Sequence, residues 1–337
     1  MQIQGSTSTM DLNRRQFLKK SSACLLSGLL PPYVAMAHSH SHIHNIIFGF
    51  GQTGIGSPLG LGICHYLHQY RYQFKNRPGH HSETAALLVK KSSPNGETIL
   101  MAKSPTMTLY PYIYKHLNYQ VDDFQPLVLL GQYTLILTVG PLVPLTVKTL
   151  DEYCDWISDH PQYRGIGFTN LKSPANLAKL MIARNKQYAF NGIAYAGTSM
   201  IIDDLVSGNL ASALIISGNG HHYFERKILR PIMVTSAHRF PSLPNIPCAS
   251  EFHLNDMNIS GWYGLMLPKK TPGNICNQLL SQILPMTHTD AFHQLQHHLK
   301  LTSDIFEPEQ FQHHIDKERI YYQTMVERYD MDTAFHA

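Results

Sequence analysis

The amino-acid sequence predicts an α/β fold, and three observations support this prediction. Short apolar, β-rich segments alternate with helical segments along most of the chain, a pattern typical of largely parallel sheets. Hydrophobic residues make up 43% of the chain and charged residues 15%, as in globular proteins. Once an N-terminal export signal is set aside, about 300 residues remain, which suits one large domain or two lobes.

Local signals indicate where the helices begin and end. Ser57-Pro58 and Ser173-Pro174 each read as an N-cap followed by proline, and Thr149 precedes two acidic residues. Gly208 suits a helix C-cap, and Pro94-Asn95-Gly96 predicts a turn. The expected strands span residues 45–50, 97–102, 126–133, 135–140, 163–169, 191–197, 211–217 and 230–237. The expected helices span residues 57–70, 82–92, 149–161, 173–185 and 199–208.

Residues 1–37 contain the three parts of an export signal. Arg14-Arg15-Gln16-Phe17-Leu18-Lys19 precedes an apolar segment, and the small residues of Ala35-Met36-Ala37 end it. The paired arginines followed by Phe-Leu-Lys suit the twin-arginine route, and the apolar segment is too short to span a bilayer. We therefore expect cleavage near Ala37 and a periplasmic location, with a basic N-terminal helix as the alternative.

A glycine-rich loop follows the first expected strand. Gly49-Phe50-Gly51-Gln52-Thr53-Gly54 has the G-x-G-x-x-G spacing of a dinucleotide-binding fingerprint. Against a dinucleotide, the helix is expected to start after Gly54, and no acidic residue follows about 20 residues later. Arg71 or Arg77 could suit a 2′-phosphate, so an exported NADP-linked oxidoreductase remains an alternative, as does a turn without a ligand. The N–H groups at the start of a helix also suit a carboxylate.

The histidines of residues 38–44 suggest a second alternative, a metal-handling protein. If cleavage follows Ala37, the new amine of His38 and the imidazole of His40 could form a copper or nickel site. The modest formal charge of +4, without a basic block interleaved with aromatics, argues against nucleic acid as a partner. No G-x-S-x-G motif is present, and we predict no catalytic residue and no cofactor.

The mature part of the chain contains four widely spaced cysteines without a C-x-x-C motif. In an oxidising compartment they could pair in three connectivities, and the alternative is that they are buried and free. These residues are Cys64, Cys154, Cys248 and Cys276.

An ordered series of motifs beyond the glycine loop resembles one family. Residues 75–82 (KNRPGHHS) stand where that family has E-N-R-P-G-A-G-G, and residues 93–100 (SPNGETIL) stand for P-P-D-G-Y-T-L-L. Residues 193–208 (IAYAGTSMIIDDLVSG) resemble V-P-Y-K-G-G-x-P-A-x-x-D-L-L-x-G. Residues 230–251 and 259–275 resemble its V-T-S-x-x-R-x-P-x-L-P and S-W-F-G-L segments. The chain thus resembles the solute-binding receptors of tripartite tricarboxylate transporters, the Bug type.

This resemblance implies a two-lobed periplasmic binding protein of the type II-like class. Each lobe would be a mostly parallel sheet flanked by helices, and crossover strands would form the hinge. The expected boundaries are 38–140 for the first part of lobe I, 141–260 for lobe II, and 261–337 for the part that completes lobe I. A small carboxylate or similar polar organic molecule would lie in the cleft between the lobes. The protein would be a non-enzymatic monomer whose closed form is read by a membrane transporter or sensor.

The resemblance also implies which residues line the cleft. Backbone N–H groups and small hydroxyl side chains would supply most ligand contacts, and they come from four loops. The first loop is Phe50, Gly51, Gln52, Thr53 and Gly54, with Ser57 at the helix cap; the second is Ser104, Pro105 and Thr106; the third is Thr169, Asn170 and Ser173; the fourth is Tyr195, Ala196, Gly197 and Thr198.

Several residues depart from the family pattern. Ser57 and Ala211 stand where the family has acids, so two acidic groups are missing. Lys103 and Lys172 flank the second and third loops and could favour an anion. The solute is therefore expected to differ from the usual ligands of the family.

Overall fold

The computed structural model describes residues 43–52 and 54–331, which lie within one compact unit, Ser41–Ala337. One lobe of this unit, lobe I, is built on β1 (His44–Phe48), β2 (Tyr72–Asn76) and β3 (Thr98–Lys103). β1 lies between β2 and β3 and pairs with both in parallel. The connections include α1 (Gly56–Tyr66), after β1, and α2 (Glu83–Lys90), after β2.

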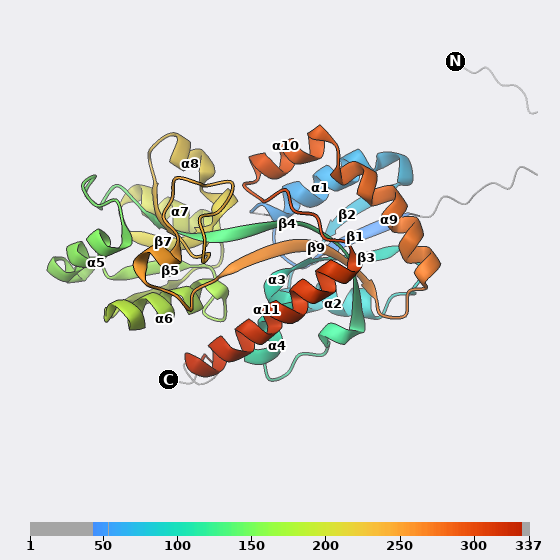
Figure 1. Cartoon of the computed structure of the whole chain (residues 1–337), viewed down its shortest axis with the longest axis horizontal. Coiled ribbons are helices and arrows are strands. Elements are labelled where there is room, and N and C mark those ends of the chain that lie inside the picture. The colour runs from blue at the N-terminus through green and yellow to red at the C-terminus, as the bar shows by residue number, and fades with distance from the viewer. Residues whose placement is uncertain (1–42, 53, 332–337) are drawn as a thin grey trace, which may run out of the picture. The chain divides into compact units, whose positions relative to one another are not determined.

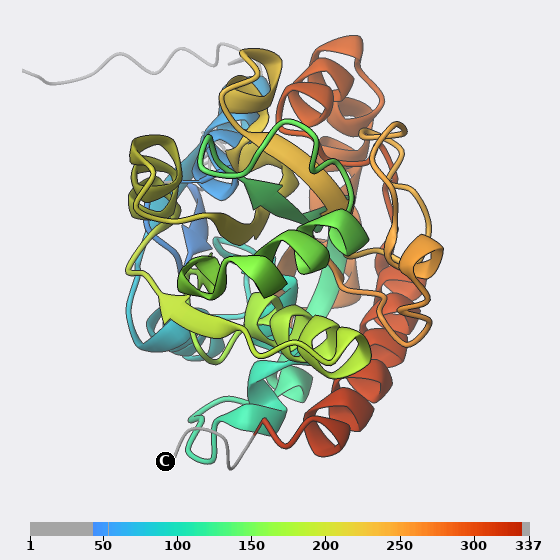
Figure 2. The same ribbon diagram turned by 90° about the vertical axis from the view of Figure 1, so that its left-hand side faces the viewer.

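The second lobe, lobe II, contains the remaining parallel strands. β5 (Gly165–Phe168) pairs in parallel with β6 (Asn191–Ala194) and β7 (Ser212–Ile216). Helices α6 (Pro174–Lys186) and α7 (Thr198–Ser207) pack on this sheet, and α5 (Leu150–Asp159) and α6 lie in front of it when the lobe faces the viewer (Figure 2). β8 (Arg230–Val234) and the short α8 (His221–Glu225) complete the lobe.

Two long strands run through both lobes. β4 (Phe124–Val139) and β9 (Ser260–Pro268) pair antiparallel and join the halves of one sheet, whose order is β2-β1-β3-β9-β4-β7-β5-β6 (Figure 1). β8 also pairs with β4. The outer strands are parallel as predicted, but every pairing of β4 and β9 is antiparallel. The sheet as a whole is therefore mixed, while the three outer strands of each lobe are parallel as expected.

The helices after β9 pack mainly on elements of lobe I, and the end of the last one reaches Arg184 of lobe II, whose guanidinium donates to the Arg328 carbonyl. α9 (Gly273–Thr287), α10 (Asp290–His298) and α11 (Pro308–Arg328) follow β9, and α11 packs against β4 and against α3 (Ser104–Thr108) and α4 (Tyr110–Ile113). The predicted lobe boundaries at 140/141 and 260/261 stay predictions, because the contacts join the whole of Ser41–Ala337 into one unit.

Most sequence signals for helix ends are confirmed. Thr149 forms a capping box with Glu152, Ser173 caps α6, and Gly208 ends α7 with φ +80°. The predicted start of the first helix is wrong by two residues, because Ile55 is the N-cap and Ser57 lies inside α1. The strands predicted at 126–133 and 135–140 form the single strand β4, and β2 was not predicted.

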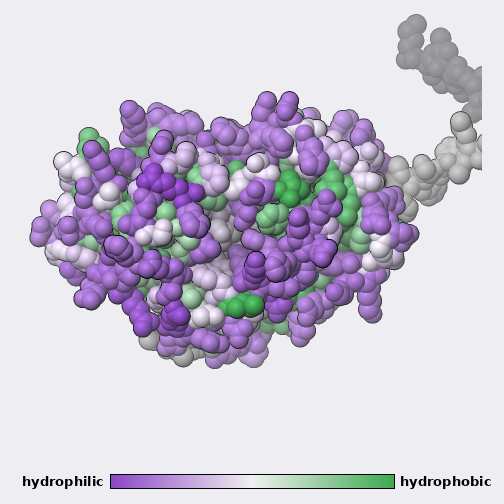
Figure 3. Space-filling view, viewed as in Figure 1, coloured by the Kyte–Doolittle hydropathy of each residue, from purple (hydrophilic) through white to green (hydrophobic). Residues whose placement is uncertain are grey.

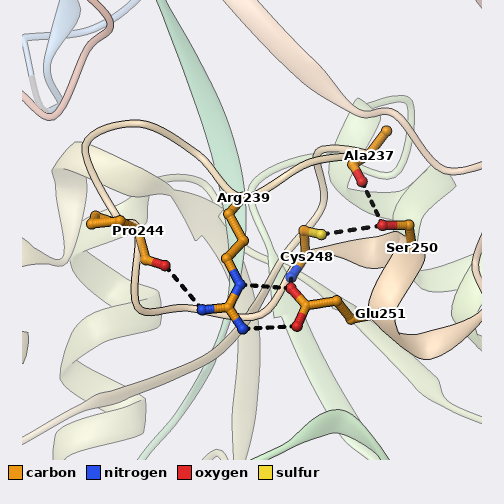
Figure 4. Close-up of polar contacts among 6 residues, drawn as sticks. All are labelled: Ala237, Arg239, Pro244, Cys248, Ser250 and Glu251. Carbon is orange, nitrogen blue, oxygen red and sulfur yellow. Dashed lines mark hydrogen bonds and ion pairs between the residues drawn. The ribbon is translucent and has the colours of Figure 1, made fainter.

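Arg239 and Glu251 of the family-like segment 230–251 stabilise the loop after β8. The Arg239 guanidinium makes two parallel hydrogen bonds to the Glu251 carboxylate, at 2.8 Å each, and a third to the Pro244 carbonyl (Figure 4). Glu251 also accepts from the Cys248 N–H, and the Arg239 hydrogen bond is the main cause that lowers the pKa of Glu251 to about 2. These two residues therefore fold the loop. They are not among the residues that line the cavity described below.

The face shown in Figure 3 is mostly hydrophilic, with small, separate hydrophobic patches. No helix among the described residues has both the length and the apolar character that a bilayer span requires. All four of these cysteines are free; Cys154 and Cys248 are buried, as the unpaired alternative expects, whereas Cys64 and Cys276 are half-buried.

The crossover strand β9 is tied to α11 by a polar contact of Trp262. Trp262 is fully buried, and its indole N–H donates to the Glu318 carboxyl at 2.7 Å. Burial raises the pKa of Glu318 to about 8. The folded state therefore binds more protons than the unfolded state between about pH 4.5 and 8, so this group makes stability fall as pH rises through that range.

We predict that Glu318→Gln and Glu318→Ala separate the effect of the Glu318 charge from that of its hydrogen bond with Trp262. Glutamine keeps an acceptor for Trp262 without a charge, so at pH 8.5 this variant should be at least as stable as the wild type. Alanine leaves the indole N–H unpaired and should cost roughly 1–3 kcal/mol. Urea denaturation at pH 6 and 8.5 measures both effects. A Gln variant that is less stable than the wild type at pH 8.5 contradicts this account.

Candidate functional site

A cavity of about 600 Å³ lies between the lobes. Its volume is in the range typical of small-molecule sites. Lobe I contributes the loops after β1, β2 and β3, and lobe II contributes the loops after β5, β6 and β7. The crossover strands form its floor through Tyr133, Leu135 and Tyr263. Because both lobes supply walls, a molecule bound here contacts both.

Eleven of the sixteen predicted site residues line this cavity. All four loops are represented, so the loop positions implied by the resemblance meet at one place. Whether these residues contact a ligand stays a prediction. The lining residues are Phe50, Gly51, Gly54, Pro105, Thr169, Asn170, Ser173, Tyr195, Ala196, Gly197 and Thr198.

The other five residues are not in the lining. Ser57 is buried and engaged within lobe I, where it donates to the Gly51 carbonyl and accepts from Asn76. Ser104 and Thr106 are fully buried within α3. Gln52 is exposed outside the lining, and Thr53 lies outside the described residues.

Two helix N-termini, one from each lobe, open into the cavity. Ile55 and Gly56 at the start of α1, and Gly197 and Thr198 at the start of α7, line it. Neither helix has a side-chain cap, so first-turn N–H groups remain available as donors. The N–H groups and the positive dipole ends favour an anion between the lobes.

The third helix at the cavity, α6, is different because it is capped. Ser173 accepts from the Asn176 N–H and donates its own hydroxyl hydrogen to the Asn170 carbonyl. Pro174 has no N–H to offer. The start of α6 therefore forms part of the cavity wall, and the Ser173 hydroxyl is already engaged as the helix cap.

Polar contacts join the lobes beside the cavity. Asn170 of lobe II donates its amide to the Nδ1 atom of His81 in lobe I, at 3.1 Å. Lys172 donates to the Ile113 carbonyl at 3.0 Å and lies 4.8 Å from the centre of the Tyr114 ring. Lys172 therefore contributes to contact between the lobes and is not in the cavity lining, whereas Lys103 is.

The backbone at His81 is unusual. His80, His81 and Ser82 all have positive φ, at 44°, 55° and 76°. This conformation is costly for residues other than glycine. His81 and Ser82 stand where the family-like motif has Gly-Gly, so the left-handed backbone is present here with side chains added. The His81 ring stacks on Tyr114 at 4.4 Å and lines the cavity.

Lys103 is the charged residue of the cavity wall. Its ammonium lies 5.0 Å from the centre of the Phe50 ring and 5.5 Å from that of Tyr133. Among the described residues, no hydrogen-bond acceptor or carboxylate partner is found for it. Burial lowers its pKa from 10.5 to about 8. The side chain is therefore mainly protonated at pH 7 and compensated only by the two aromatic faces.

Asn219 supplies a second unsatisfied group. Its Nδ2 donates to the Thr198 hydroxyl at 3.3 Å, whereas its buried Oδ1 has no partner. The residue lines the cavity next to Gly54, which needs glycine because its φ is +105°. A ligand that donates a hydrogen bond would satisfy this oxygen.

Sequence reasoning missed several lining residues. Tyr133 and Tyr263 lie on crossover strands whose faces are both buried, so no alternation of polar and apolar residues marked them. Asn219 lies in Ser217-Gly218-Asn219-Gly220, at the end of a predicted strand. A polar residue at that position was the signal that could have identified it as a cavity residue.

The metal candidates His38 and His40 lie outside the described residues. Among the residues that the structure describes, no cluster of three or more His, Cys, Asp or Glu side chains could hold a metal ion.

The architecture, two lobes that share crossover strands around a cavity, defines the periplasmic solute-binding class. Several solved structures have a similar fold. A Rhodopseudomonas palustris protein with adipate has a TM-score of 0.78 at 18% identity, covering 87% of this chain and 98% of that one. MatC from the same organism, with bound malate, has a TM-score of 0.71 at 19% identity and coverages of 85% and 99%. The periplasmic binding protein BugD has a TM-score of 0.73 at 17% identity, with coverages of 86% and 98%.

The sequence places the chain within that class. Residues 62–329 match the family model described as tripartite tricarboxylate transporter family receptor, so this chain belongs to that family. A UPF0065 protein from Pseudomonas sp. (strain P51) is 26% identical over 210 residues, 62% of each chain. A UPF0065 protein from Bordetella pertussis is 22% identical over 256 residues, 75% of this chain and 78% of its own length. The chain thus spans less than two thirds of the Pseudomonas relative.

We predict that Lys103→Met stabilises the ligand-free protein at pH 7. The pKa of Lys103 is lower in the folded state than in the unfolded state, so charging it opposes folding below about pH 8 and this penalty disappears toward pH 10.5. The variant should gain roughly 1–3 kcal/mol at pH 7, and the gain should shrink at pH 10. Urea denaturation at the two pH values is the measurement, with the exposed Lys270→Met as control. A Lys103→Met variant that is less stable than the wild type at pH 7 would contradict the uncompensated burial.

Proposed function

We propose that this protein is an exported, periplasmic, non-enzymatic receptor that captures a small carboxylate in the cavity between its lobes. Family membership and the shared fold support a receptor over an NADP-linked oxidoreductase or a metal-handling protein. The adipate and malate in two solved relatives support a carboxylate as ligand class. A membrane transporter or sensor would receive the loaded form, and the first 37 residues would direct export by the twin-arginine route.

The cavity's positive electrostatics carry this proposal. Two uncapped helix N-termini and the Lys103 ammonium face the space between the lobes, and the described lining residues include no Asp or Glu. Such a site favours a carboxylate because charge-assisted hydrogen bonds to N–H donors are stronger than those between neutral groups. The site residues would contact the ligand mainly through the loops of Gly51, Gly54, Thr169 and Thr198.

Lobe closure supplies the signal to the partner. The paired contacts of His81 with Asn170 and of Lys172 with Ile113 join the lobes beside the cavity. A bound ligand would contact the cavity walls of both lobes, and so favour the closed arrangement over the open one. A partner that recognises the closed surface would then distinguish loaded from empty receptor.

We predict that a small organic acid raises the thermal midpoint of the mature protein and that Gly51→Trp removes the effect. At about 100 times its dissociation constant a ligand adds roughly 2.7 kcal/mol, or several degrees for a domain of this size. The panel comprises mono-, di- and tricarboxylates, amino acids, NADP, and zinc, copper and nickel salts. Gly51 lines the cavity with open space around it, so tryptophan fills the cavity without distorting the backbone.

Gly273→Trp is the matched control, because Gly273 also has open space around it and lies outside the cavity lining. A shift with an acid that persists in the control and is lost in Gly51→Trp supports the proposal. A shift with NADP alone would instead indicate a nucleotide site, and a shift with metal salts alone would indicate the histidines of 38–44.

A further inference from the structure

We propose that the solute is a monocarboxylate with a largely apolar body, and that the Lys103 ammonium pairs with its carboxylate. This inference rests on the receptor function proposed above and specifies its ligand. It depends on three properties of the cavity: the number of charges in its wall, the apolar character of that wall, and the unsatisfied oxygen of Asn219.

The charged side chains of the wall favour a ligand with one negative charge. Lys103 is the only Lys, Arg, Asp or Glu among the described lining residues. One carboxylate restores neutrality around its ammonium, whereas a second or third would be buried without a counter-charge, which is costly. An amino acid would bring its own ammonium group into a wall that contains no carboxylate.

The position of Lys103 directs the carboxylate to lobe I. The ammonium lies between the Phe50 and Tyr133 rings, and Lys103 is in register with Tyr263 on β9. The loop of Phe50 leads directly to the uncapped start of α1, which also lines the cavity. A carboxylate that meets Lys103 therefore has backbone N–H donors of the same lobe nearby.

The rest of the cavity wall is suited to the hydrocarbon part of a ligand. Six aromatic side chains line the cavity, namely Phe48, Phe50, Tyr110, Tyr133, Tyr195 and Tyr263. Leu135, Leu214 and Ile216 add aliphatic surface. Apolar and aromatic walls gain free energy from covering apolar ligand surface, which a hydroxyl-rich acid such as citrate does not offer.

Asn219 argues against a carboxylate on the lobe II side. Its buried Oδ1 lacks a partner and lies beside Gly54. A second carboxylate would place acceptor against acceptor, whereas a hydroxyl or amide N–H on the ligand would donate to this oxygen. A ligand with one carboxylate and, at a distance from it, a neutral hydrogen-bond donor fits both Lys103 in lobe I and Asn219 in lobe II.

The test compares acids with their uncharged amides on the full mature protein at pH 7. Calorimetric titration would use hexanoate with hexanamide, phenylacetate with phenylacetamide, and 4-hydroxyphenylacetate, alongside adipate, malate, citrate and phenylalanine. We expect a monocarboxylate to bind most tightly and to exceed its amide by at least about tenfold in affinity. In Lys103→Met this preference should disappear, so that acid and amide bind about equally. The exposed Lys270→Met should keep it.

Several results would overturn the inference. A dicarboxylate, a tricarboxylate or an amino acid that binds most tightly, and is lost in Gly51→Trp, would leave the receptor function standing and refute the monocarboxylate. An acid preference that survives in both Lys103→Met and Lys103→Gln would refute the role of Lys103. No binding by any acid in the panel would refute both the inference and the carboxylate-receptor function.

Discussion

The antiparallel pairing of β4 with β9 is the interaction on which the rest of the structure depends. It runs from Phe124 opposite Pro268 to Thr134 opposite Ser260, and both lobes attach to it. β3 adds to the free edge of β9, and β7 and β8 add to the later part of β4. The pairing is irregular near Gly131, whose φ of +142° and close approach to the Thr302 carbonyl require glycine. Because Tyr133 and Tyr263 also form the cavity floor, a change in this pairing reaches the ligand site directly.

The order of strands and helices was predictable because each element depends on residues close together in the sequence. Thr149, Ser173 and Gly208 mark helix ends through contacts within one turn, and all three are confirmed. Strand pairing was less predictable, since β4 meets β9 and β7 at separations that no local pattern encodes. The long β4 looked like two strands because Thr134 interrupts an apolar run, yet it is buried and continues the ladder.

The candidate site was predictable at the level of loops, and less so for side chains. The resemblance identified four loops that meet at the cavity, but a shift of two residues at the start of α1 turns Ser57 toward Asn76. Ser104 and Thr106 are fully buried in α3, a short helix that was not predicted, and they are not in the cavity lining. His80, His81 and Ser82 have the left-handed backbone that suits the motif's glycines, but they carry side chains that glycine lacks. No rule of local propensity predicts histidine there.

The burial of Lys103 gives a physical reason for ligand-dependent closure. In the proposed open cleft its ammonium would be hydrated. Bringing the lobes together would remove part of that water without supplying an acceptor among the described residues. The phenyl ring of Phe50 and the phenol ring of Tyr133 recover only part of the lost hydration. A carboxylate in the cavity changes this balance, because the exclusion of water that penalises the lone cation strengthens its attraction to an anion. Closure around an empty cavity would then be disfavoured and closure around the proposed solute favoured, so one half-buried lysine would serve both recognition and switching.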